Sequence, residues 1–325
     1  MRALPAEAAT QCGVFSIWQA ERAGWTRSAL RHAVSTGRLV RLRVGAYQAT
    51  DLHEVVEGLD PFEEARWRHA APAIASVLTT PGAVASHSTA AVLGGIPLIF
   101  LPDRSCLSVV PWLTGEVPRV HLHRCSMPPR PFPIGEVDTT SVERIVIDLA
   151  REHGVPAGVV AADYTLRQHM TSIDALTAEL DRCLRWPGVR AAREAIAFAD
   201  PRSESVLESR SRLKLREFSL PTLEPQVRIG NERGRFVARV DFYSDEYGVV
   251  AEADGAVKYD GTEPRPLIEE KKRQEQLEDL HLEVVRWGTS DLSDFGSVAR
   301  RLRRAFARGL QRPQSARLWT VLPPL

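Results

Sequence analysis

The sequence predicts an α+β protein of several domains, because three kinds of pattern follow one another along its 325 residues. Residues 1–50 are rich in arginine, the middle repeats apolar residues at helical spacing, and the last third alternates helical segments with short apolar strands. We expect an N-terminal winged helix-turn-helix over residues 1–52 and a mainly helical domain over 53–202. An α/β domain is expected over 203–312, followed by a tail over 313–325.

The composition is ordinary for a globular protein, with 44% hydrophobic and 26% charged residues. No apolar run approaches the roughly 20 residues that cross a bilayer, and the N-terminus lacks the apolar core of a secretory signal. The four cysteines show no C-x-x-C spacing: Cys12, Cys106, Cys125 and Cys183. We therefore expect reduced thiols in a cytoplasmic protein without membrane contact, and neither a disulfide framework nor a zinc site.

Residues 10–50 have the order of a winged helix-turn-helix. A first helix fits TQCGVFSIWQAERAG, in which Phe15, Trp18 and Gln19 have helical spacing and the last glycine is a stop signal. Thr26 can cap a second helix, RSALRHAVSTG, with an apolar stripe on one side. The following segment, RLVRLRVGAYQA, suits a β-hairpin wing around its glycine.

The arginines of this region indicate a polyanionic partner. Residues 1–50 contain seven arginines and two glutamates. Arg27 and Arg31 fall together on the second helix, opposite its apolar stripe, and three more arginines decorate the wing: Arg38, Arg41 and Arg43. Such a helix fits the major groove of DNA, and wing arginines reach phosphate or the minor groove. The alternative is a helical domain with a solvated basic face, but the order of helix, turn and wing favours DNA binding.

Residues 55–200 are predicted to be mainly helical, with a strand-rich middle. The strands are SCLSVVP and VPRVHLHRC, the proline-rich MPPRPFPIG is an irregular connector, and Thr140-Ser-Val-Glu143 is a capping box that opens a helix. His87, His121 and His123 could suggest a metal or a general base. No third ligand follows at a zinc-like spacing, so we expect surface or core histidines.

Two segments of the middle carry a resemblance to a known family. Together with the N-terminal pattern, ASHSTAAVLGGIPL and VDTTSVERIVIDLAR resemble the actinobacterial AbiEi-type proteins, the transcriptional antitoxins of type IV toxin–antitoxin systems. The resemblance spans roughly residues 10–200. It implies an autorepressor-like DNA-binding module with a helical companion domain and a toxin partner.

The last third has the predicted element order αβββαβα. The helix SVLESRSRLKLREF is followed by strands in VRI, RFVARVDFYS and YGVVAEAD, then a charged helix PLIEEKKRQEQLEDL, the strand LEVVRW and a final helix. This order and the spacing D-x(10)-E-x-D-G-x-x-K resemble the restriction-endonuclease-like, or PD-(D/E)xK, fold of domains related to very-short-patch-repair endonucleases. The resemblance covers about residues 203–292 and implies a metal-dependent phosphodiesterase that hydrolyses DNA.

Charged residues within the apolar stretch VDFYSDEYGVVAEADGAVKY form the candidate catalytic site. A tight hairpin would bring Asp241 opposite Glu252, with Cβ atoms about 4.5–5.5 Å apart. Two carboxylates so placed repel each other unless a divalent cation lies between them, and oxygen ligands suit Mg²⁺, with Mn²⁺ as a substitute. Asp254 shares the strand face of Glu252, and Lys258 could turn back toward the cluster.

Each of these residues also has a structural interpretation. Glu208 lies three positions after Ser205 and is as well placed to cap a helix as to bind metal. Asp241 and Glu252 could belong to a solvated sheet face, and the aspartate before Gly255 could be a turn signal. The usual E-x-K motif is absent, since Asp254 stands in the lysine position, which leaves the lysine role to Lys258 or Lys271.

Two main functions follow from these alternatives, with Mg²⁺ or Mn²⁺ as the cofactor of the first. The chain is either a metal-dependent DNA endonuclease guided by its winged helix, or a non-catalytic, antitoxin-like regulator that retains a nuclease fold. A protein-interaction role of the last domain is a third, weaker alternative.

Overall fold

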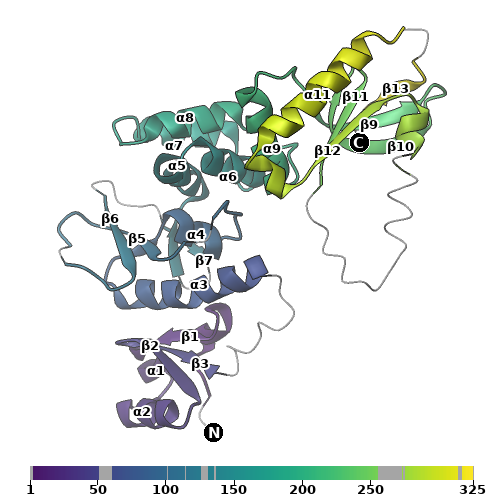
Figure 1. Cartoon of the computed structure of the whole chain (residues 1–325). Coiled ribbons are helices and arrows are strands. Elements are labelled where there is room, and N and C mark those ends of the chain that lie inside the picture. Colours follow the sequence, from purple (N-terminus) through teal and green to yellow (C-terminus); the bar gives the residue numbers. More distant parts are fainter. Residues whose placement is uncertain are drawn as a thin grey trace. The chain divides into compact units, whose positions relative to one another are not determined.

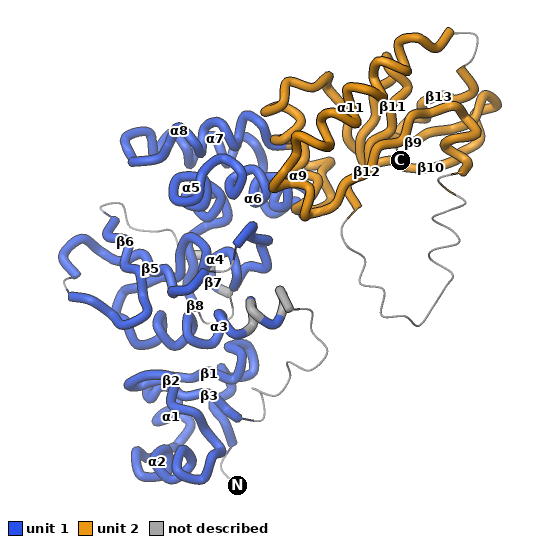
Figure 2. The backbone as a smooth tube through the Cα atoms, viewed as in Figure 1, with its two compact units in different colours: residues 1–199 blue, residues 200–325 orange. Residues whose placement is uncertain are grey.

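The computed structural model describes residues 3–50, 61–100, 102–113, 115–125, 131–134, 137–254, 273, 275–313 and 317–324. The chain forms two compact units, residues 1–199 and residues 200–325 (Figure 2). Among the described residues, no helix is both long and apolar enough to cross a membrane.

The first 50 residues form a small α/β module (Figure 1). Its elements are η1 (Ala6–Thr10), β1 (Val14–Ser16), α1 (Ile17–Arg22), α2 (Arg27–Ser35), β2 (Leu39–Arg43) and β3 (Ala46–Ala49). The strands form an antiparallel sheet in the order β1-β3-β2. Phe15, Trp25 and Leu30 are buried in its core.

The predicted first helix is wrong in its N-terminal half. Cys12 and Gly13 both have positive φ values, 53° and 75°, which interrupt a right-handed helix. The chain then enters β1, where Phe15 is fully buried. Ser16 begins α1 and forms a capping box with Gln19. The helical spacing of Phe15 and Gln19 therefore reflects burial on two different elements.

The middle of the first unit contains a five-stranded mixed sheet in the order β6-β5-β4-β8-β7. The elements are α3 (Pro61–Thr79), β4 (Val84–Ala85), α4 (His87–Leu93), β5 (Ser105–Val109), β6 (Val120–Arg124), β7 (Pro131–Ile134) and β8 (Val137–Thr140). The expected irregular connector is thus partly wrong, because Pro131–Ile134 pairs with β8. Its prolines are tolerated because β7 is an edge strand and needs fewer backbone donors.

Four helices complete this unit and confirm the helical prediction for residues 142–200. They are α5 (Val142–His153), α6 (Val155–Arg167), α7 (Ile173–Arg182) and α8 (Val189–Phe198). The predicted capping box is shifted by one residue, because Ser141 is the N-cap and its Oγ accepts a hydrogen bond of 3.3 Å from the Arg144 amide. Thr140 instead ends β8.

The second unit is a five-stranded sheet covered by helices. Its elements are α9 (Val206–Glu217), β9 (Glu224–Asn231), β10 (Phe236–Ser244), β11 (Val249–Ala253), β12 (Glu283–Trp287), η3 (Thr289–Leu292), α11 (Phe295–Leu310) and β13 (Trp319–Leu322). The strand order is β12-β11-β10-β9-β13, in which only the β11–β12 pair is parallel.

Residues of β10 and β11 are divided between two apolar clusters. Phe242 and Ala251 join the cluster that includes residues of α9 and α11, whereas Val240 and Tyr243 join a second cluster with Trp319. The residues expected to form a tail therefore contribute a strand, since β13 pairs with β9 and Trp319 is buried. Of the predicted charged helix, the described positions 273 and 275–279 are helical.

Candidate functional site

Helix α2 presents a basic face to solvent. Thr26 caps the helix by accepting a hydrogen bond of 3.2 Å from the Ala29 amide. Leu30 and Ala33 form the buried face of the same helix. Arg27 and Arg31 are exposed on the other side, as predicted. The Arg27 side chain is 73% exposed and lies 3.5 Å from Glu21, a surface ion pair that contributes little free energy and can be exchanged for a phosphate.

The arginines of the β2–β3 hairpin divide into two groups. Arg38 and Arg41 are exposed. Arg43 instead donates a hydrogen bond of 2.8 Å from Nη1 to Ser76 Oγ of α3, and partial burial lowers the pKa of its guanidinium. The structure therefore places Arg43 as an anchor between the hairpin and α3, apart from the exposed arginines.

In the second unit, the predicted carboxylates do come together. Phe242 pairs with Ala251 across β10 and β11, so this register sets Asp241 opposite Glu252. Asp241 Oδ2 accepts a hydrogen bond of 2.9 Å from the amide of Ala253. Asp254 follows on the face of Glu252 and is exposed.

Glu252 is held by two arginines rather than standing as a bare carboxylate. Its side chain is almost fully buried, Oε1 lies 2.8 Å from Arg273 Nη1, and Oε2 lies 2.6 Å from Arg286 Nη2. Arg286 is the direct neighbour of Glu252 in the parallel β11–β12 register, and its Nε also lies 3.8 Å from Asp254 Oδ2. The negative charge of Glu252 is therefore already compensated by two guanidinium groups of the second unit.

Glu208 is hydrogen-bonded at the start of α9, where Ser205 is the N-cap. Ser205 Oγ donates to Oε1 at 2.8 Å and accepts from the Glu208 amide at 3.1 Å. The Glu204 amide and Gln226 Nε2 donate to Oε2 at 2.9 Å and 2.8 Å. Both oxygens of this buried carboxylate are thus used at the start of α9.

The negative charge of Asp241 is less well compensated than those of Glu208 and Glu252, because its carboxylate accepts one backbone hydrogen bond and has no arginine partner among the described residues. Burial raises its pKa to about 6, against the lowering effect of the Ala253 amide, and the charges of Glu208, Glu252 and Asp254 raise it further. This electrostatic coupling shows that the four carboxylates are neighbours. Lys258 and Lys271, the candidates for the lysine role, lie outside the described residues.

The N-terminal module matches a known family, and longer parts of the chain are similar to individual proteins. Residues 2–50 match the family model described as a transcriptional regulator, AbiEi antitoxin. The chain is 28% identical over 159 residues to two uncharacterized proteins of Mycobacterium tuberculosis, MT2308 of strain CDC 1551 / Oshkosh and Rv2248 of strain H37Rv. These matches cover 49% of this chain and 58% of each relative.

One similar solved structure is the crystal structure of the RV2827C protein from Mycobacterium tuberculosis. It is 17% identical, covers 64% of this chain and 78% of that chain, and superposes with a TM-score of 0.32. The AbiEi antitoxin-like character of the N-terminal module is therefore confirmed over residues 2–50. The family match does not extend to the carboxylate cluster of the second unit.

Sequence reasoning missed one concentration of reactive side chains. His123 lies against both His87 and His121, and Cys106 lies beside His121 and His123. The expectation of surface or core histidines did not include this proximity. The useful signal was the strand spacing of His121 and His123, which puts both rings on one face of β6. Their neighbours come from β5, α4 and α5, which no local spacing reveals. All four cysteines are free, as predicted.

Proposed function

We propose that this chain is a DNA-binding transcriptional regulator of the AbiEi antitoxin type, and that residues 3–50 act as a winged helix-turn-helix with α2 as its recognition helix. The observation that carries the proposal is the exposed Arg27 and Arg31 face of a capped helix inside the region that matches the family. Helix α2 contains no acidic residue, so its whole exposed face is compatible with DNA.

The geometry suggests separate tasks for the exposed arginines. The N-terminal part of a recognition helix contacts base edges in the major groove, which suits Arg27 and Arg31. Arg38 and Arg41 on the hairpin would contact phosphates and fix the orientation of the module. Each phosphate contact releases counterions, so binding would weaken steeply with salt. Repression of a promoter and a toxin partner are implied by the family.

The test is fluorescence anisotropy on labelled DNA over a salt series. We expect Arg27→Ala and Arg31→Ala each to weaken binding by about 1–3 kcal/mol and to relax specificity at the base pair that each contacts. Arg41→Ala is expected to weaken binding to all sequences uniformly and to reduce the salt slope by about one, because it removes a phosphate contact.

The matched control is Arg190→Ala, since Arg190 is also exposed in the first unit but lies on α8. It should leave both the affinity and the salt slope unchanged. If a triple variant of Arg27, Arg31 and Arg41 keeps the wild-type salt slope, the proposed DNA-binding role of residues 3–50 is wrong.

A second candidate function is DNA hydrolysis by the second unit, which we propose has a restriction-endonuclease-like fold. Two observations support it: the order α9, β9, β10, β11, β12, α11, and the gathering of Asp241, Glu252 and Asp254. Asp241 and Glu252 are the proposed ligands of Mg²⁺ or Mn²⁺, and Glu252 would have to exchange an arginine for the ion. Such an ion would orient a water and neutralise charge on the phosphate, with Lys258 as the proposed lysine of the site.

A further inference from the structure

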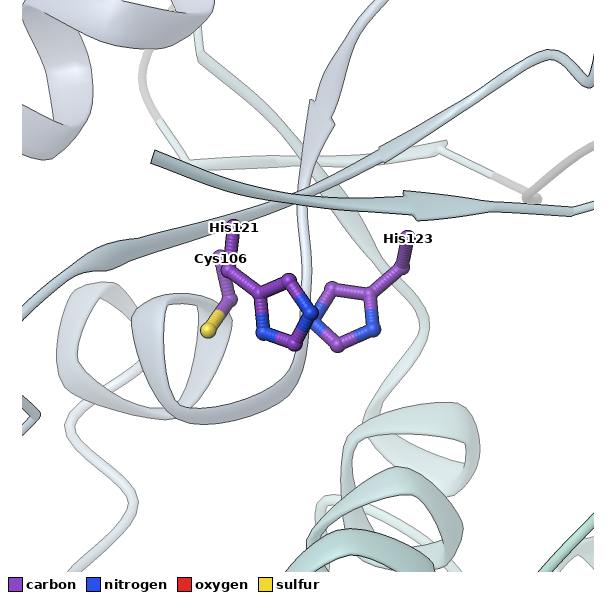
Figure 3. A group of neighbouring side chains, drawn as sticks. All are labelled: Cys106, His121 and His123. Carbon is purple, nitrogen blue, oxygen red and sulfur yellow. The ribbon is translucent and has the colours of Figure 1, made fainter. Parts of the chain in front are cut away.

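Two neighbouring strands of the first unit present metal-ligand side chains on the same face. Strands β5 and β6 are parallel, with Cys106 paired to His121 and Ser108 paired to His123. Paired residues and residues two apart share a face, so the thiol and both imidazoles project to one side. Figure 3 shows the three side chains gathered beneath the strands.

The distances between these groups suit a shared ion. One ligand atom each of Cys106, His121 and His123 lie within 4.8 Å of one another. The two rings have centroids 4.1 Å apart with planes inclined by 42°. Helix α5 brings Glu152 to the same place, with Oε1 at 3.6 Å from His121 Nδ1. A ligand atom of Glu152 also lies within 4.8 Å of one of His123, so this carboxylate could supply a fourth donor.

His123 offers a ring nitrogen that could bind an ion. Its Nε2 is buried and has no hydrogen-bond partner within the part of the chain that the structure describes. A buried ring nitrogen without a partner is unusual, because folding normally satisfies such atoms.

We propose that Cys106, His121, His123 and Glu152 bind a divalent transition-metal ion, with zinc as the best match. Thiolate, imidazole and carboxylate are all ligands of tetrahedral zinc, whereas Mg²⁺ and Ca²⁺ prefer oxygen ligands alone. The site is independent of the proposed DNA-binding module, because residues 3–50 contribute none of the four ligands.

His87 packs against the proposed site but is not one of its four ligands. It also lies near His123 and Glu152, with ligand atoms within 4.8 Å. However, the His87 and His123 rings stack at 3.5 Å with planes only 16° apart, so their in-plane lone pairs lie in two parallel planes and do not converge on one ion. His87 Nε2 lies 3.8 Å from Asp148 Oδ2, and Asp148 is fixed by Arg144 at 2.7 Å and Arg151 at 2.6 Å.

Solvent can reach the cluster from two directions. The His121 side chain is 55% exposed. His87 and His123 also line a pocket of about 300 Å³ whose wall includes Arg144, Arg151 and Trp186. An ion can therefore enter without unfolding of the unit.

The test is metal titration of the full-length protein. We expect one zinc ion per chain, measured by competition with a chromophoric chelator after treatment with EDTA. His121→Ala and His123→Ala should each weaken zinc binding by at least about tenfold. Cobalt(II) should give a thiolate-to-metal charge-transfer band in the wild type that Cys106→Ser removes.

Two variants control for thiol and imidazole loss elsewhere. Cys183→Ser removes another buried thiol and His32→Ala removes an exposed imidazole, and both should bind zinc like the wild type. Wild-type affinity in His121→Ala, an exposed site at which the fold tolerates the change, would overturn the proposal. A cobalt complex without a thiolate band would overturn the role of Cys106. Neither result bears on DNA binding by residues 3–50, which is measured separately.

Discussion

Asp241 and Glu252 occupy neighbouring positions of one sheet, yet their charges are compensated differently. Glu252 has Arg273 and Arg286 against its two oxygens, whereas Asp241 accepts one backbone hydrogen bond among three other carboxylates. The sequence predicted both acids and their opposition from the apolar context of the hairpin. It did not predict the arginines, because Arg286 reaches Glu252 through a parallel strand pair about 30 residues further along the chain.

At the residue scale, Asp241→Asn should stabilise the metal-free protein at high pH. The folded-state pKa of about 6 lies above the unfolded value of 3.8, so the unfolded chain loses its proton first. Stability from this group is therefore present below pH 4 and declines as pH rises through about 6. At 1.36 kcal/mol per pKa unit, we expect Asn to stabilise by about 1–3 kcal/mol at pH 8 and little at pH 4. Thermal melts in EDTA at both pH values measure it.

Glu252→Gln is the comparison variant and should act in the opposite direction. It leaves Arg273 and Arg286 without their carboxylate, which should cost about 3 kcal/mol. Added magnesium should raise the melting temperature of the wild type and have little effect on Asp241→Asn, if the endonuclease proposal holds. The endonuclease proposal would be wrong if Asp241→Asn destabilises the protein in EDTA and magnesium shifts the melting temperature of neither the wild type nor this variant. Only the proposed regulator function would then remain.

At the scale of elements, local signals predicted helices better than strands. The caps at Thr26, Ser141 and Ser205 lie at or next to the predicted positions, because capping depends on a few adjacent residues. Five strands were missed, since each is defined by the strand with which it pairs: β1, β4, β7, β8 and β13. The sequence predicted the element order αβββαβα of the second unit but not its fifth strand, β13.

Helix α11 offers a matched pair of glycines for testing how closely it packs. A Cβ at Gly309 would lie 1.9 Å from the backbone oxygen of Tyr247, whereas a Cβ at Gly296 would meet nothing closer than 3.5 Å. We expect Gly309→Ala to destabilise the protein by about 1–3 kcal/mol, because backbone must move. Gly296→Ala should be neutral or stabilising by up to about 1 kcal/mol, because alanine favours helix. Urea denaturation compares them, and equal effects of the two substitutions would contradict the close approach.

At the scale of the whole molecule, the proposed functions belong to separate parts of the chain. The arginine-rich composition of residues 1–50 was enough to predict a basic module, since charge is a property of sequence. The histidine cluster was not predictable, because its ligands come from two strands and a helix that meet only in the folded unit. The carboxylates of the second unit were partly predictable from the sequence, since one hairpin sets Asp241 and Glu252 side by side.

The division into two units predicts that residues 200–325 fold without the rest of the chain. This fragment contains the complete five-strand sheet and both apolar clusters. It should melt cooperatively, as single domains of this size usually do.

A fragment of residues 200–313 should be less stable by about 3–5 kcal/mol, because it lacks the buried Trp319 and leaves the edge of β9 unpaired. Trp319 also donates a hydrogen bond from Nε1 to the hydroxyl of Tyr243, which would lose this partner. Thermal melts of the two fragments compare them directly. A longer fragment without a cooperative transition would show that the second unit depends on the first, and equal melting temperatures would show that β13 adds nothing to its stability.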